Sequence, residues 1–96
     1  MGEHRLRLVW APEALRDVEE SVAYIAQDSI AAAIAVEDRI IAAAEGLLKL
    51  PLKGRARTGG RRELVVASTS FKLIYRLEEG AVVLVRVWHM SRQPLA

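Results

Sequence analysis

Three closely spaced runs of strand-forming residues in the last third of the chain, Gly59–Pro94, constrain the fold most strongly. They read Arg-Arg-Glu-Leu-Val-Val, Phe-Lys-Leu-Ile-Tyr-Arg-Leu and Val-Val-Leu-Val-Arg-Val-Trp-His, separated by the turn sequences Ser-Thr-Ser and Glu-Glu-Gly. Runs rich in β-branched and aromatic residues between turns predict successive strands, most simply an antiparallel meander. Basic residues recur inside the runs, so we expect one face of the sheet on a core and the other on solvent or a partner.

The first half of the chain predicts a strand and two helices. Residues 4–10 alternate apolar and polar side chains with the period of a strand. Pro12 suits the first position of a helix, and Ser29 can supply the N-cap of a second helix. That second helix extends from Ile30 to about Lys49, and Leu50-Pro51 ends it.

The second helix is dominated by alanine, isoleucine and leucine, so its apolar arc is wide. The many alanines permit close packing of the first helix in an αα-hairpin. The remaining arc is either covered on a second side or exposed as a groove for a partner segment. The predicted fold is a single α+β domain, residues 1–96, of order β-α-α-β-β-β. Its helical hairpin packs on one face of a mainly antiparallel four-stranded sheet.

Composition excludes several classes of protein. No run of 18 or more apolar residues is present, so no membrane-spanning helix is expected. The chain has no cysteine, and its only histidines are His4 and His89, so we expect neither a disulfide framework nor a metal site, and no cofactor. Charged N-terminal residues unlike a signal peptide, together with the lack of cysteine, fit a cytoplasmic protein.

Charge is unevenly placed along the chain. Residues 1–50 hold five Lys/Arg against nine Asp/Glu, a balance of −4, whereas residues 51–96 hold nine against three, a balance of +6. This segregation predicts a basic surface built by the C-terminal half and suited to an anionic partner, or simply a solvated basic face. Residues 52–60 form a predicted basic loop, which either contacts a polyanion or is simply solvated.

Period-two alignment of the strands assigns side chains to faces. We place the wholly apolar sides against the helices. The residues then expected on the open face, as a partner-binding set, are Arg5, Arg7, Lys72, Arg76, Arg86 and Trp88. Arginines around an aromatic ring, with no acidic residue among them, resemble a contact for nucleic acid or an acidic peptide. A β-bulge would break the alignment.

Catalytic signals are sparse. His89 is the best candidate general acid or base, although a lone histidine at a strand end is more often a structural hydrogen-bonding group. No serine or threonine lies in a recognisable triad. Glu13, Asp17 and Glu20 share one face of the first helix and are expected to form a solvated surface. These patterns alone establish no enzyme.

Several segments, in order along nearly the whole chain, resemble the RelE/ParE superfamily of bacterial type II toxins. The segments are Val9–Asp17, Tyr24–Ala26, Leu50–Arg55, Gly60–Leu64, Phe71–Arg76 and Val85–His89. The resemblance implies a helical hairpin on an antiparallel sheet, which agrees with the element order predicted above. It also implies the toxin of a plasmid-stabilisation system, neutralised by a cognate antitoxin.

The superfamily holds two activities. RelE-like members are ribosome-dependent endoribonucleases that use clustered basic residues and often a C-terminal tyrosine, whereas ParE-like members poison DNA gyrase. Here the positions of the ribonuclease lysine pair are Glu63 and Val65, Lys72 stands for an arginine, and no tyrosine follows His89. The resemblance therefore favours the gyrase poison.

The ribosome-dependent mRNA endoribonuclease is the alternative. Its candidate catalytic residues are His89, Arg62, Arg92 and Lys72. The antitoxin is expected to dock, as an acidic amphipathic segment, on the open basic face and the alanine-rich helix arc. It should bury Arg76, Arg86 or both.

Overall fold

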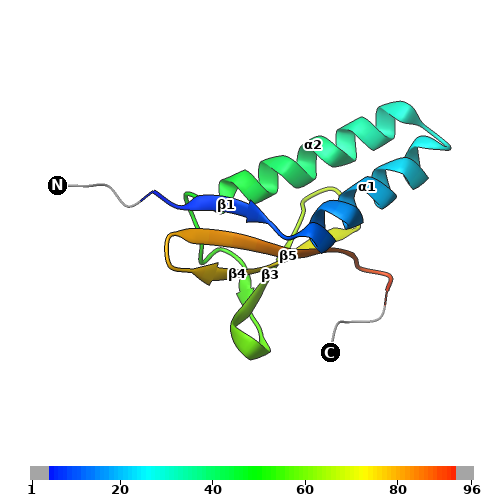
Figure 1. The fold of residues 1–96 in the computed structure, drawn as a ribbon. Coiled ribbons are helices and arrows are strands. Elements are labelled where there is room, and N and C mark those ends of the chain that lie inside the picture. Colours follow the sequence, from blue (N-terminus) through cyan, green and yellow to red (C-terminus); the bar gives the residue numbers. More distant parts are fainter. Residues whose placement is uncertain (1–4, 93–96) are drawn as a thin grey trace.

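Two helices cover one face of a twisted five-stranded sheet (Figure 1). The computed structural model describes residues 5–92. In chain order the elements are β1 (Arg7–Trp10), α1 (Pro12–Ala26), α2 (Ile30–Gly46), β2 (Arg55–Ala56), the short 3₁₀ turn η1 (Thr58–Gly60), β3 (Arg61–Val65), β4 (Phe71–Glu78) and β5 (Ala81–His89). The strand order is β1-β5-β4-β3-β2. The α+β class and the helical hairpin on one face of the sheet are confirmed.

The sheet has one strand more than the four expected. The additional strand, β2, lies in the predicted basic loop and pairs antiparallel with β3 through Arg55 opposite Glu63. Two residues are too few to show an alternating pattern, so the sequence gives no signal for this strand. β1 is parallel to β5, and the other pairings are antiparallel. The part of the first strand predicted at His4 lies outside the described residues.

Both helices begin where their local sequence predicts. Pro12 is the first residue of α1, and the Ser29 side chain accepts a hydrogen bond from the backbone N–H of Ala32 at 3.0 Å. α2 ends at Gly46, three residues before the expected end, and residues 47–49 continue as turns. Helix ends commonly tighten in this way, because the last carbonyls accept shorter-range hydrogen bonds.

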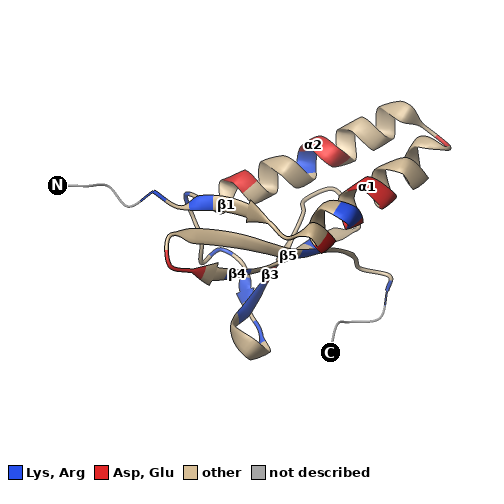
Figure 2. Cartoon of the chain, viewed as in Figure 1, with Lys and Arg blue, Asp and Glu red and all other residues tan. Residues whose placement is uncertain are grey.

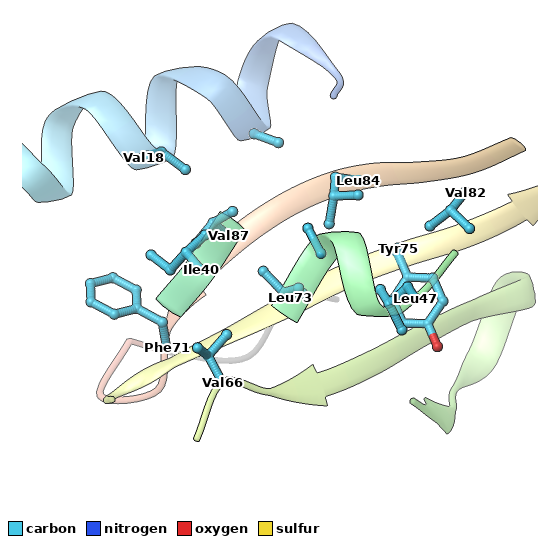
Figure 3. Packing of buried hydrophobic residues seen from close by; sticks show 12 residues of the cluster. Val18, Ile40, Leu47, Val66, Phe71, Leu73, Tyr75, Val82, Leu84 and Val87 are labelled. Atoms are coloured by element: carbon cyan, nitrogen blue, oxygen red, sulfur yellow. The ribbon is translucent and has the colours of Figure 1, made fainter. Parts of the chain in front are cut away.

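The core lies between the helices and the sheet (Figure 3). Ile40 and Leu47 of the α2 segment meet Leu73 and Tyr75 of β4, and all four side chains are fully buried. The outer part of the α2 arc is not covered, since Ile34 is 53% exposed. Of the two interpretations of the wide apolar arc of α2, the one that leaves part of the arc exposed is correct within this chain.

A β-bulge in β5 shifts the face alternation. Ile74 is paired with Arg86 but Tyr75 with Leu84, so Val85 is the extra residue on the bulged strand. Val87, beyond the bulge, faces the core as expected. Before the bulge the expected assignment is wrong, because Leu84 belongs to the core rather than to the open face.

Candidate functional site

The open face of the sheet, opposite the helices, carries an acidic residue on β3. The pairing of β3 with β4 places Glu63 opposite Ile74, on the same face as Lys72. The Glu63 carboxylate lies 3.0 Å from Nζ of Lys72 and 3.7 Å from Nε of Arg57. The expectation of a face without acidic residues is therefore wrong, since β3 contributes a glutamate to it.

The other cations expected on this face differ in their surroundings. Arg76 pairs with Glu78 at 2.6 Å, and both side chains are about half exposed. Arg7 is exposed on β1, at the far edge of the sheet from β2 and β3, and Arg5 precedes that strand. The structure therefore spreads the predicted partner-binding set over the sheet and partly neutralises it (Figure 2). Whether these residues bind a partner remains a prediction.

Arg86 is not a free cation, because it forms a bidentate pair with Asp17 of α1. Arg86 Nε and Nη2 donate to the two carboxylate oxygens at 2.7 and 2.9 Å. The Val87 backbone N–H donates to the same carboxylate at 2.9 Å. β1 ends at Trp10, opposite Leu84, so Asp17 takes the place of a neighbouring strand next to the bulge.

The same pairing corrects the expectation that Asp17 lies on a solvated acidic row. Its side chain is 8% exposed. Hydrogen bonding to the carboxylate raises the pKa of Arg86 above its ordinary value.

Trp88 lies between two arginines at the end of β5. The guanidinium carbons of Arg86 and Arg92 are 5.0 and 5.3 Å from its ring centroid, within the range of cation–π attraction. Through Arg86, these contacts connect the end of β5 to Asp17 of α1.

The four candidate ribonuclease residues do not converge. Arg62 pairs with Tyr75 and His89 with Phe71, positions four residues apart on β4, or about 13 Å along the strand. Arg62 Nη1 donates to the carbonyl oxygens of Gly54, at 2.8 Å, and Leu52, at 3.4 Å, so it supports a loop. Lys72 lies on the opposite face from the buried Phe71, because neighbouring strand residues alternate.

Of that set, His89 and Arg92 line one cavity. It has a volume of about 760 Å³ and lies between the C-terminal half of α1 and the turn at residues 68–70. The His89 ring packs edge-on against Phe71, and its Nδ1 accepts a hydrogen bond from the backbone N–H of Ser91 at 3.1 Å. Nδ1 is therefore already engaged by the backbone of Ser91.

Tyr75 anchors the loop before β2, and the sequence analysis did not predict this role. Its hydroxyl donates to the Pro51 carbonyl and accepts from the Gly54 backbone N–H, each at 2.8 Å. A β-carbon at Gly54 would lie 2.5 Å from this hydroxyl, so only glycine fits. The lone glycine after Leu50-Pro51 was the only available signal.

Within residues 5–92, no three His, Asp or Glu side chains are grouped closely enough to hold a metal ion. The helices described there are too short or too polar to cross a lipid bilayer.

Comparison with known proteins identifies the family. The family model described as "ParE toxin of type II toxin-antitoxin system, parDE" matches residues 8–94. Y4kP of Sinorhizobium fredii is 37% identical over 90 residues, which cover 93% of each chain. Toxin RelE2 of Caulobacter vibrioides is 36% identical over 86 residues, covering 90% of this chain and 97% of that protein.

A solved structure described as the chromosomal ParDE TA system from P. aeruginosa has the same fold. Its TM-score is 0.79 at 18% identity, and the match covers 91% of this chain and 98% of that one. The matched family model spans nearly all of the described residues, and the two relatives align with this chain over most of their own length. The chain belongs to the ParE toxin family of type II toxin–antitoxin systems, within the RelE/ParE superfamily.

Proposed function

We propose that this toxin inhibits DNA gyrase in the cytoplasm and is neutralised by a cognate antitoxin. The observation that carries the proposal is the ion pair between Glu63 of β3 and Lys72 of β4, at 3.0 Å, on the open face. RelE-like cleavage of RNA uses clustered basic residues, which stabilise the charge that develops on the phosphate. Here the carboxylate of Glu63 occupies one of the two expected lysine positions, and Val65, at the other, has no charge.

Ribosome-dependent cleavage of mRNA is the second candidate, and two observations favour it. One relative is named Toxin RelE2, and His89 shares its cavity with Arg92. If this activity exists, His89→Ala or Arg92→Ala should abolish it, because these groups would supply hydrogen bonding and positive charge.

Expression of the chain without its antitoxin separates the candidates. A gyrase inhibitor arrests growth with DNA damage and accumulates cleaved gyrase–DNA complexes, while mRNA stays intact. A ribonuclease stops translation and leaves cut mRNA. Growth with neither effect would contradict both candidates and leave a binding module without toxicity.

A further inference from the structure

A strongly basic hairpin, formed by β2, η1 and β3, lies at one edge of the sheet. Residues 46–62, which lead into it and form its turn, contain six Lys or Arg and no acidic residue. The hairpin extends from the sheet on the side away from the helices (Figure 1), and Figure 2 shows its basic positions. This projecting segment is therefore accessible to an anionic partner.

Three of these positive charges have no counter-charge within the chain. Lys49, Lys53 and Arg55 are exposed and form no ion pair with another residue in the described range 5–92. The Arg57 side chain is 45% exposed and lies 3.7 Å from the carboxylate of Glu63, which is closer to Lys72. The hairpin therefore keeps a net positive charge that is available to a partner.

The arginines of the hairpin lie on one of its faces. Arg55 is paired with Glu63, and Arg61 lies two residues before Glu63 on β3, so these side chains share the open face. The contact with Glu63 places the Arg57 guanidinium on this face as well. Cations in a row on one face suit a partner with regularly repeated negative charges.

The backbone of the hairpin has a defined path. The Arg57 N–H donates to the Arg61 carbonyl at 2.7 Å and closes the turn, while Arg62 holds the Gly54 carbonyl at the base. Gly59 and Gly60 at the tip have φ values of 76° and 75°, and a β-carbon on either would meet no atom within 4 Å. The tip backbone can therefore approach a partner closely.

Shape and composition favour duplex DNA as this partner. The major groove of B-form DNA admits a two-stranded β-ribbon such as this hairpin, whereas the major groove of double-stranded RNA is deep and narrow. A protein partner would normally require an apolar centre in the interface, but Ala56 is the only apolar residue between Lys53 and Arg62. Lys and Arg at these positions would contact phosphates without reading the base sequence.

We propose that the β2–β3 hairpin enters the major groove of duplex DNA, where Lys53, Arg55 and Arg57 contact the phosphate backbone. The affinity for DNA depends only on the hairpin. The assignment of this duplex to the DNA held by gyrase depends on the proposed function.

The test measures binding of the full chain to a labelled DNA duplex two helical turns long, by fluorescence anisotropy at several salt concentrations. The double variant Lys53→Gln, Arg55→Gln removes two exposed cations and breaks no ion pair within residues 5–92. It should weaken binding at low salt by at least about tenfold. The slope of log K against log salt should decrease in magnitude by about two, because two fewer counterions are released.

A matched control removes the same charge from the helices. Arg16→Gln, Arg39→Gln changes two exposed arginines on α1 and α2 and should leave the salt slope nearly unchanged. Circular dichroism of both double variants verifies that they fold.

Competition experiments test the partner class. Unlabelled duplex DNA should displace the labelled duplex at lower concentration than double-stranded RNA of the same sequence or poly-glutamate does. RNA or poly-glutamate that competes as well as DNA would overturn the proposal. Absence of duplex binding at low salt, or equal losses of affinity in the two double variants, would also overturn it.

These measurements contain neither gyrase nor ribosomes, so they can fail or succeed separately from the proposed function. If the chain inhibits gyrase, Lys53→Gln, Arg55→Gln should weaken that inhibition. Full inhibition by this variant would reject the DNA held by gyrase as the duplex that the hairpin binds.

Discussion

The Tyr75 hydroxyl connects the chain between α2 and β2 to the centre of the sheet. It bonds to Pro51 and Gly54, while Arg62 bonds to the carbonyl of Gly54 from the neighbouring strand. Loops rarely hold a defined path without such contacts, because their backbone groups otherwise bond to water. Arg62, a residue with a candidate catalytic role, is thus occupied by a structural one.

Tyr75→Phe should lower the free energy of unfolding by about 1–3 kcal/mol, the cost of leaving buried hydrogen-bonding groups unsatisfied. Urea denaturation followed by circular dichroism measures this change. The control is Tyr24→Phe, since Tyr24 is 73% exposed and its hydroxyl can bond to water. Equal stability of the two variants would mean that the Tyr75 hydroxyl does not anchor the loop.

Gly54→Ala tests the same contact sterically. The added β-carbon would meet the Tyr75 ring and hydroxyl at 2.5–2.9 Å, so we expect a loss of about 1–3 kcal/mol from overpacking. Gly46→Ala is the matched control, because a β-carbon added there would have no atom within 4 Å. That variant should be neutral or slightly more stable, since alanine favours a helix end over glycine. The comparison is again made by urea denaturation, and similar losses for both would contradict the steric argument.

At the scale of elements, α1 and β5 are joined by a carboxylate. β5 loses its outer neighbour where β1 ends, and its bulge would leave a backbone N–H unpaired there. Asp17 accepts that N–H and holds Arg86 against Trp88. The position and direction of the chain after Val87 therefore depend on a residue from α1.

Asp17→Asn should destabilise the protein by about 1.5–3 kcal/mol, because it removes hydrogen bonds that involve a charged pair with one largely buried member. Asp38→Asn, an exposed substitution with the same chemistry, should change stability by no more than about 0.5 kcal/mol. Thermal unfolding of both variants provides the measurement. A melting temperature for Asp17→Asn equal to that of the wild type would show that this pair does not fasten α1 to β5.

Element order and helix starts were predictable because they are local. Pro12 and Ser29 mark helix starts through properties of their own, and the three C-terminal strands show their period. The bulge at Val85 was not visible in the sequence, because one extra residue leaves an equally regular pattern. The face of Leu84 depended on it.

At the scale of the whole molecule, charges of opposite sign lie on the two layers. The charge balances of the two halves of the sequence predicted this segregation. They could not show which charges are neutralised by a nearby charge of opposite sign. Glu63 reaches Lys72 and Arg57 only through the pairing of β3 with β4. For the same reason, residue type alone suggested a ribonuclease set in which the fold separates Arg62 and Lys72 from His89 and Arg92.

Removal of the Glu63 charge should release the basic groups that it neutralises. Glu63→Gln is expected to increase non-specific binding to duplex DNA and to steepen its salt dependence by about one released counterion or more. Glu79→Gln alters net charge equally at an exposed turn and should have a smaller effect. Fluorescence titration at several salt concentrations makes the comparison, and identical salt slopes for both variants would argue against local neutralisation.

We propose that this toxin acts on gyrase rather than on RNA. The most direct measurement incubates the purified chain with gyrase, ATP and relaxed plasmid, and in parallel with ribosomes translating a defined mRNA. We expect reduced supercoiling with accumulation of cleaved plasmid, no mRNA cleavage, and relief of inhibition by the cognate antitoxin. Unchanged supercoiling together with cut mRNA that His89→Ala or Arg92→Ala abolishes would contradict the account.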